Sequence, residues 1–234
     1  MTKNLVIIPA RGGSKGISHK NIKTIAGKPL IAWSIEQALS TSTVDRVIVS
    51  TDCKEIKAIA KEFGAEVPFL RPSELASDTA TTEPVITHAI NWLRKEESYC
   101  SDNIVLLQPT SPIRYRNRIT DALKKIENED VDSLFSVVEA EIFLWTDLNN
   151  PRSLYDFKNR PRRQDIKESE LIYRENGSIY ITKTGIFEQL NNRLTERSAA
   201  LLMSTEEGVD IDTYIDWEIA ECILIRLIKE KKLD

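Results

Sequence analysis

Cysteine, glycine and proline are scarce in this chain of 234 residues, and each scarcity excludes a class of protein. The three cysteines, Cys53, Cys100 and Cys222, are too few and too far apart for a disulfide framework or a zinc site. Eight glycines and nine prolines exclude a fibrous or linker-rich chain. No run approaches the roughly 20 apolar residues that span a bilayer, and the N-terminal apolar run is too short for a signal peptide. We therefore expect a cytoplasmic protein with no membrane partner.

The net charge of the chain is also small. The chain has 32 Lys and Arg against 36 Asp and Glu, so its net charge is −4. A general nucleic-acid binder would usually be basic, and we expect no nucleic-acid partner. The length suits one domain, residues 1–234, that buries a core without disulfides or metal ions.

Short apolar segments alternate with amphipathic segments along most of the chain. This alternation predicts an α/β fold with a mainly parallel sheet and helices on both faces. The expected strands are residues 5–9, 46–50, 67–70, 104–107, 134–138, 177–182 and 199–203, and the expected helices are residues 29–39, 54–63, 83–95, 117–126 and 214–231.

Segment Glu139–Tyr173 interrupts this alternation. It has no clear period, yet it holds five of the 16 aromatic residues and the cations Arg160, Arg162 and Arg163. A segment of this length inside a compact domain usually has a function or folds separately. We interpret it as an inserted arm whose aromatic side chains pack on the second subunit of a homodimer. The alternative is a surface insertion that closes its own small core.

The strongest local motif is Pro9–Gly16, which reads Pro-Ala-Arg-Gly-Gly-Ser-Lys-Gly directly after the first expected strand. Its glycines would let backbone N–H groups approach a phosphate chain. Six Lys and Arg residues precede Glu36, the first acidic residue, and this density suits a triphosphate. A solvated basic loop is the alternative. The motif is neither a Walker A loop nor G-x-G-x-x-G.

Two further segments carry candidate ligands. Asp210-Ile211-Asp212 precedes the last expected helix, and in extended backbone its two carboxylates share one face. Paired carboxylates near phosphates suit Mg²⁺, although Asp212 or Thr213 could instead cap the helix. The segment Gln108–Pro112 leaves a strand at its carboxyl end, where open α/β sheets bind ligands. A structural turn is equally compatible with its spacing.

Taken in order, these motifs resemble those of the CMP-sialic acid synthetases, the acylneuraminate cytidylyltransferases. The matching segments are Ile8–Ile17, Lys20–Ile22, Leu70–Pro72, Ala76–Ala80, Gln108–Pro112, Arg160–Asp165, Asn176–Tyr180 and Asp210–Asp212. The resemblance covers essentially the whole chain. It implies a three-layer α/β/α, Rossmann-like nucleotidyltransferase fold, CTP as donor, Mg²⁺ as cofactor, and a dimer whose arm reaches the neighbouring active site.

The resemblance also implies a role for individual residues. Arg11 and Lys20 would bind phosphates, within a nucleotide-binding loop that includes Ala10, Gly12, Gly13 and Lys15. The residues expected around the cytidine are Asn21, Arg71, Ala80 and Thr82, where Thr82 keeps the hydroxyl of the Ser found in many relatives. Gln108 would contact the acceptor sugar. Arg162, Arg163 and Arg174 are candidates for the sugar acid or the departing pyrophosphate, and Asp210 and Asp212 would hold the metal.

The activity implied is transfer of CMP from CTP to the anomeric C2 hydroxyl of a nine-carbon 2-keto sugar acid, with release of pyrophosphate. Arg11, Lys20, Arg162, Arg163 and Asp212 are the expected catalytic residues. The acid would be sialic, legionaminic or a related nonulosonic acid. One alternative is a nucleotidyltransferase for another sugar acid, such as Kdo, or for another nucleotide. A second alternative is a non-catalytic nucleotide-binding regulator, against which the pair Asp210 and Asp212 argues.

Overall fold

A six-stranded sheet forms the centre of the computed structural model, which describes residues 2–14 and 16–233. Its strand order is β10-β6-β9-β5-β1-β4. The strands are β1 (Asn4–Pro9), β4 (Arg46–Ser50), β5 (Asn103–Leu107), β6 (Ser133–Ala140), β9 (Ile172–Lys183) and β10 (Ser198–Leu202). All run in one direction except β9, which is antiparallel to both β5 and β6. The predicted parallel-dominated α/β sheet is confirmed.

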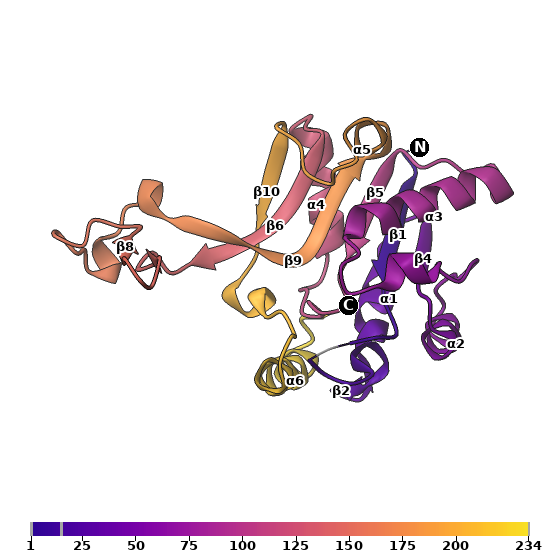
Figure 1. The fold of residues 1–234 in the computed structure, drawn as a ribbon, viewed down its shortest axis with the longest axis horizontal. Coiled ribbons are helices and arrows are strands. Elements are labelled where there is room, and N and C mark those ends of the chain that lie inside the picture. Colours follow the sequence, from indigo (N-terminus) through magenta and orange to yellow (C-terminus); the bar gives the residue numbers. More distant parts are fainter. Residues whose placement is uncertain (1, 15, 234) are drawn as a thin grey trace.

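Helices lie on both faces of this sheet and complete three layers (Figure 1). They are α1 (Leu30–Leu39), α2 (Lys54–Glu62), α3 (Thr82–Glu97), α4 (Arg118–Asn128), α5 (Thr184–Leu190) and α6 (Tyr214–Lys229). Helices α1, α2 and α4 pack on one face, and α3 and α5 pack on the other. Helix α6 packs on α1 and on the hairpin of β2 (Thr24–Ile25) and β3 (Lys28–Pro29). No helix within the described ranges is long and apolar enough to cross a membrane.

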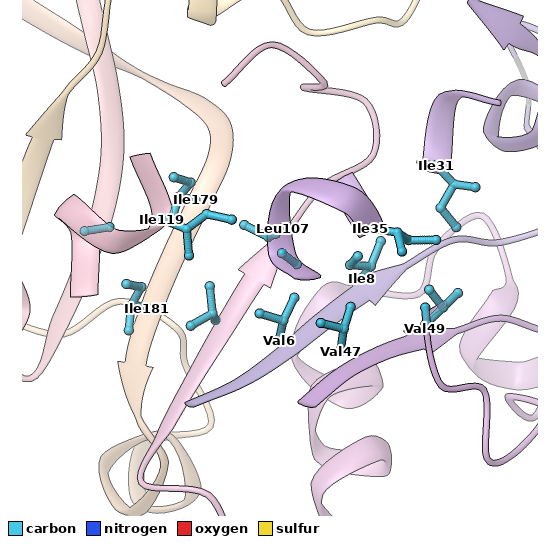
Figure 2. Packing of buried hydrophobic residues seen from close by; sticks show 14 of the residues in the cluster. Val6, Ile8, Ile31, Ile35, Val47, Val49, Leu107, Ile119, Ile179 and Ile181 are labelled. Carbon is cyan, nitrogen blue, oxygen red and sulfur yellow. The ribbon is translucent and has the colours of Figure 1, made fainter. Parts of the chain in front are cut away.

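The burial of β1 explains why its sequence is a continuous apolar run. Val6 and Ile8 contribute to the cluster that includes Ile35 of α1 (Figure 2), whereas Leu5 and Ile7 lie in the cluster on the α3 face. A parallel strand covered on both faces needs apolar residues at every position rather than at alternate ones. The run therefore fits a strand inside the sheet, between β5 and β4, and the loop after β1 lies at the carboxyl edge.

One expected strand is wrong. Residues 67–70 form no strand, and only Glu66 makes an isolated bridge, to Ile48 of β4. Pro68 has no N–H to donate, so ladder pairing stops at this edge. Val67 and Phe69 nevertheless bury their side chains, each in a different core cluster, so the apolar pattern reflects packing at the sheet edge.

The antiparallel direction of β9 follows from the insertion before it. Strands β6 and β9 remain paired out to Ala140 and Ile172, and carry the arm away from the body of the molecule (Figure 1). The chain thus returns directly alongside β6 instead of crossing over through a helix, which is the connection that a parallel pair requires.

The arm closes a small aromatic cluster of its own around the short strands β7 (Trp145–Thr146) and β8 (Arg152–Ser153). The ring of Trp145 lies 6.1 Å from Tyr155 and 5.7 Å from Phe157, and Arg160 stacks 3.9 Å from the ring of Phe143. Large apolar side chains remain exposed around this cluster, with Leu148 97% and Leu154 62% accessible. The arm therefore has a local core and an apolar surface as well.

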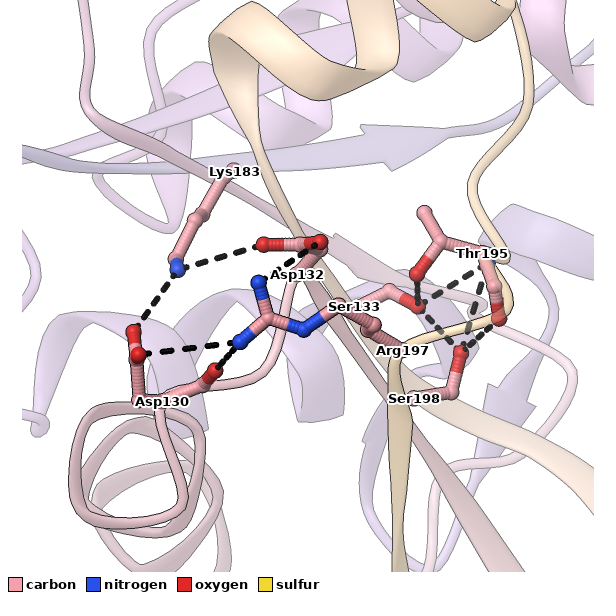
Figure 3. A network of polar contacts seen from close by, with 7 residues as sticks. All are labelled: Asp130, Asp132, Ser133, Lys183, Thr195, Arg197 and Ser198. Carbon is pink, nitrogen blue, oxygen red and sulfur yellow. Dashed lines mark hydrogen bonds and ion pairs between the residues drawn. The ribbon is translucent and has the colours of Figure 1, made fainter.

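Polar side chains form a network at the end of the sheet that lies opposite the carboxyl edge of β1, where β6 and β10 begin and β9 ends (Figure 3). Lys183 lies 3.4 Å from Asp130 and 3.3 Å from Asp132, and Arg197 pairs with the same two carboxylates. The hydroxyl groups of Ser133 and Ser198 are 2.5 Å apart. These charged and hydroxyl groups pair with one another, so the network has a structural role in holding the ends of β6, β9 and β10 together.

Candidate active site

A cavity of about 380 Å³ lies at the carboxyl edge of β1 and β5. Because these strands are parallel neighbours, the segments that follow them meet there. Among the sequence-predicted residues, the cavity is lined by Arg11, Lys20, Asn21, Arg71, Ala80, Thr82, Gln108 and Asp212. These residues come from six separate parts of the chain, so the fold assembles a large part of the expected site.

The loop after β1 is held by groups that neighbour it. The N–H of Gly12 donates to Oδ1 of Asp52 at 2.9 Å, and Asn21 donates its side-chain amide to the carbonyl of Arg11 at 3.0 Å. Gly16 approaches the C-terminal part of the site so closely that a Cβ there would lie 2.2 Å from the carbonyl oxygen of Asp212. Close packing therefore requires glycine at position 16.

Two of the cations that line the cavity, Arg11 and Lys20, have acidic partners. Arg11 donates to Oδ1 of Asp78 at 2.8 Å and to the carbonyl of Ser77 at 3.1 Å. Nζ of Lys20 lies 2.5 Å from the carbonyl of Ile211 and 3.2 Å from Oδ1 of Asp212. Both side chains are thus held in place by neighbouring acceptors.

The segment Asp210–Asp212 alternates as predicted, with Ile211 fully buried and both carboxylates exposed. Neither carboxylate caps α6. The cap is Thr213, whose hydroxyl accepts from the N–H of Asp216, while Asp216 accepts from the N–H of Thr213 at 2.7 Å. The capping alternative therefore applies to Thr213, and the Asp210 and Asp212 carboxylates are left for another role.

Arg71 is the most constrained cation of the cavity, and only 6% of it is exposed. Burial lowers the pKa of its guanidinium, and the nearby Asp52 carboxylate opposes this shift. Nη2 lies 3.7 Å from Oδ1 of Asp52, beyond normal hydrogen-bond range, and among the described residues neither Nη2 nor Nε has a hydrogen-bond partner. Buried polar groups usually have partners, so these two donors indicate a ligand site.

Gln108 also lines the cavity and is the first residue after β5. Its side chain packs over Gly177 of β9, where a Cβ would lie 2.6 Å from Oε1 of Gln108. Gly177 also has a φ of +69°, which a residue with a side chain adopts at a cost. The glycine therefore lets this amide lie against the β9 backbone.

Several predicted residues lie away from the cavity. Ala10 is buried and bonded to Ser50, and Gly13 is exposed on the loop. Arg162 pairs with Asp165 and Arg163 pairs with Glu141, both within the arm. Arg174 donates to the carbonyl of Gly208 at 2.8 Å. Lys15 lies outside the described residues.

No group of three or more His, Cys, Asp or Glu side chains suited to a metal ion occurs in residues 2–14 and 16–233. Of the expected metal pair, Asp212 lines the cavity, whereas Oδ1 of Asp210 lies 3.5 Å from the Ser111 hydroxyl. Mg²⁺ is commonly bound through one or two carboxylates together with substrate phosphates, so this pair fits such an ion only in the company of a phosphate ligand.

Sequence reasoning missed three residues that shape the site: Asp52, Asp78 and Arg114. Asp52 follows β4 by two residues, at the carboxyl edge where ligands bind, and that position was a usable signal. Asp78 lies in the recognised segment Ala76–Ala80, but its partner Arg11 is 67 residues away. Arg114 is fully buried beneath the Gln108 segment, and its position in the sequence gives no sign of this.

A larger cleft, about 970 Å³, lies at the opposite edge of the sheet. Asn4, Asp45, Asp102, Asp130 and Lys183 are among its lining residues. It lacks the glycine-containing loop and lies at the amino ends of β1 and β5. We therefore place the candidate active site in the smaller cavity.

The fold is that of cytidine nucleotide transferases of known structure. A CMP:2-keto-3-deoxy-manno-octonic acid synthetase complexed with CTP superposes with a TM-score of 0.70 at 19% identity, covering 96% of this chain and 99% of that one. A 4-diphosphocytidyl-2C-methyl-D-erythritol synthase superposes with a TM-score of 0.69 at 10% identity, covering 96% and 100%. At these identities the likeness establishes the nucleotidyltransferase fold alone.

The sequence model of the cytidylyltransferase family matches residues 5–215, and this chain belongs to that family of enzymes. It is 42% identical to N-acylneuraminate cytidylyltransferase B of Danio rerio over 94% of its length, but spans about half (51%) of that protein. It is 36% identical to the CMP-N,N'-diacetyllegionaminic acid synthase of Legionella pneumophila, covering 94% of this chain and 95% of the relative. A pseudaminic acid cytidylyltransferase of Campylobacter jejuni is 32% identical, covering 94% and 96%. The resemblance seen in the motifs is confirmed.

Proposed function

We propose that the chain transfers CMP from CTP to the anomeric C2 hydroxyl of a nine-carbon 2-keto sugar acid and releases pyrophosphate. The observation that carries this proposal is the single cavity that gathers Arg11, Lys20, Arg71 and Gln108. Two cations suit a phosphate chain, a buried guanidinium suits a base, and a neutral amide suits a sugar. Relatives of matching length are named for legionaminic and pseudaminic acids, which supports the acceptor class.

In this proposal Arg71 recognises the cytosine base. A guanidinium can only donate hydrogen bonds, and the O2 and N3 atoms of cytosine can only accept them. N3 of uracil carries a hydrogen and would oppose the same donors. The buried, unpartnered Nε and Nη2 atoms of Arg71 support this role. Backbone carbonyl groups near Ala80 would accept from the cytosine amino group, and Asn21 and Thr82 would complete the nucleoside pocket.

Arg11 and Lys20 bind the triphosphate in this proposal. The planar guanidinium of Arg11 can bind two phosphate oxygens at once, whereas Lys20 provides a compact point charge. Their contacts with Asp78 and Asp212 hold both cations at the cavity before a nucleotide enters. Fixed cations of this kind stabilise the charge that develops on a departing pyrophosphate. The glycine-containing loop with Ala10, Gly12, Gly13 and Lys15 would surround these phosphates.

Mg²⁺ is the proposed cofactor, held by Asp210 and Asp212 together with nucleotide phosphates. Both carboxylates are exposed and neither caps α6, and Asp212 lines the cavity, which supports this assignment. When bound, the ion would neutralise charge on the phosphate oxygens. Lys20 contacts Asp212 and would keep this carboxylate oriented toward the phosphates.

The reaction is a substitution at the α-phosphorus. The C2 hydroxyl oxygen of the acceptor forms a bond to this atom as the bond to the bridging oxygen of pyrophosphate breaks, and the hydroxyl loses its proton. Gln108 would position the acceptor, because its neutral side-chain amide lines the same cavity as the phosphate-binding cations. The enzyme's contribution is therefore mainly orientation and charge stabilisation.

We also propose that the chain works as a homodimer through the arm, residues 139–173. The exposed Leu148 and Leu154 support this, since such apolar surface usually marks an interface. Arg162 and Arg163 lie in the arm away from the chain's own cavity, and in a two-fold dimer they would face the neighbouring cavity. Arg174, on β9 at the base of the arm, would help to hold that interface or the sugar acid.

The proposed compartment is a reducing cytoplasm. Its support is that Cys53, Cys100 and Cys222 are all free in the structure, as expected where thiols stay reduced.

A two-way panel tests the proposed function. Pyrophosphate release is measured with CTP or UTP, each in the presence of N-acetylneuraminic, legionaminic, pseudaminic or Kdo acid. We expect release with CTP and at least one nine-carbon acid, and a kcat/KM for UTP lower by about 100-fold or more, because a hydrogen-bonding site leaves buried donors unpaired with the wrong base. Turnover with Kdo alone, or equal turnover of CTP and UTP, would contradict the proposal.

A further inference from the structure

Arg114 is the largest fully buried side chain of the protein, and the proposed chemistry does not use it. It follows the Gln108–Pro112 segment and precedes α4. Only 1% of the residue is exposed, and its guanidinium lies between α1, β9 and the segment after β5. A charged group in this position needs an explanation, because long charged side chains are rarely buried without a pairing partner.

The hydrogen bonds of Arg114 connect three parts of the fold. Nη1 donates to the Ser34 hydroxyl at 3.1 Å and to Oε1 of Gln37 at 3.0 Å, both on α1. Nη2 donates to the carbonyl of Gln108 at 3.0 Å and to the carbonyl of Ser178 on β9 at 2.8 Å. One nitrogen atom therefore joins the cavity wall to the strand beside it.

Gln37 extends this connection to the other end of the same segment. Its Nε2 donates to the carbonyl of Pro112 at 3.0 Å. Thus the segment 108–112 is held at its first residue by Arg114 and at its last residue by a partner of Arg114. The bonds from Nη2 of Arg114 hold the Gln108 backbone close to β9. At this short distance the Gln108 side-chain amide packs directly against Gly177 of β9.

All four acceptors of Arg114 are neutral. The nearest acid that affects it is Glu207, which is already paired with Arg118 at 2.7 Å. Burial lowers the pKa of Arg114 to about 9, so it remains protonated at neutral pH at a cost in stability. An apolar side chain of the same volume would avoid that cost but could not donate these four hydrogen bonds.

We infer that Arg114 is a positioning residue that sets the acceptor wall of the active site through Gln108. The nucleotide side is held by different contacts, such as Asp52 with Gly12 and Asn21 with Arg11. Loss of the Arg114 contacts therefore impairs the use of the sugar acid and leaves CTP binding intact. This inference rests on the proposed function, because it takes Gln108 as the acceptor contact.

Arg114→Lys tests this inference, since it keeps the charge but cannot make all four bonds. We expect kcat/KM for the sugar acid, at saturating CTP, to fall by about 10- to 100-fold, as small misplacements of substrate do. The dissociation constant of CTP, measured by calorimetry without acceptor, should change by less than about twofold. Ile126→Ala, a core truncation on α4 near the opposite edge, is the control for stability: it lowers the melting temperature without this selective effect.

Gln37→Met is the second variant, for the case in which Arg114→Lys does not fold. It removes the bonds to Arg114 and Pro112 at similar volume, and it should reduce acceptor use selectively but to a smaller extent. Proportional losses for CTP and acceptor, or unchanged acceptor kinetics, in the variant that folds would overturn the inference. An inactive wild-type protein with every acid and CTP would instead overturn the proposed function itself.

Discussion

Replacing Arg71 by Met should weaken nucleotide binding without weakening the fold. Two nitrogen atoms of the buried guanidinium, Nε and Nη2, have no hydrogen-bond partner among the described residues. Burial also lowers the pKa of Arg71, so the charged form is disfavoured in the folded state. For a base whose pKa is lower in the folded state, this penalty is present at neutral pH and is relieved only as pH rises through the folded-state pKa. Met has a similar length, and removes the penalty.

The expected loss of affinity follows from the same contacts. A hydrogen bond to a charged group contributes about 1.5–3 kcal/mol, so losing one bond to the base raises the dissociation constant by about 10- to 100-fold. Because the contact is with the base, CMP and CTP should lose affinity equally. Asp52 keeps its bond from the N–H of Gly12 in the variant, so the loop after β1 should stay in place.

Calorimetry with CMP and CTP, together with thermal unfolding of the free protein, checks this prediction. The melting temperature should be unchanged or higher. A fall of more than about 4 °C, which corresponds to roughly 1 kcal/mol in a chain of this size, would show that Arg71 is mainly structural. Wild-type affinity for CMP would remove Arg71 from the base site.

Three other changes separate the remaining roles. Asp212→Asn should lower turnover at saturating Mg²⁺ by orders of magnitude and leave the melting temperature unchanged. The matched control is Thr213→Ala, which removes the cap of α6 and should lose about 1 kcal/mol of stability but keep its turnover. The reverse pattern would refute the metal role. Arg11→Ala should weaken CTP binding more than CMP binding in calorimetry, and equal losses would place Arg11 away from the β- and γ-phosphates. Deleting residues 141–170 behind a short linker should give a monomer in light scattering that binds CTP but turns over poorly, and an active full-length monomer at nanomolar concentration would end the dimer proposal.

The parts of the fold that the sequence predicted depend on local signals. Strands β1 and β4 each contain an uninterrupted run of buried apolar residues, and the glycine-containing loop is recognisable from composition alone. The error at residues 67–70 has a different origin. Val67 and Phe69 are buried as a strand would be, but Pro68 lacks the donor that strand pairing needs. Burial and pairing give the same apolar pattern, and only the structure separates them.

The direction of β9 and the pairing of charges were beyond local reasoning. β9 runs antiparallel because an arm of more than 30 residues returns alongside β6, and this depends on the path of the chain in space. Arg11 meets Asp78 and Lys20 meets Asp212 over sequence separations of 67 and 192 residues. The motifs identified these residues as candidates, whereas their partners follow from the tertiary fold.

Phosphorus NMR of one reaction mixture tests the central claim most directly. The mixture contains the protein, CTP, Mg²⁺ and the sugar acid that gives the highest pyrophosphate release. The proposed reaction predicts that the triphosphate signals are replaced by pyrophosphate and by a single phosphodiester that links CMP to C2 of the acid, in equal amounts. Formation of CDP and inorganic phosphate, or of pyrophosphate with free CMP and no sugar-linked phosphodiester, would contradict it.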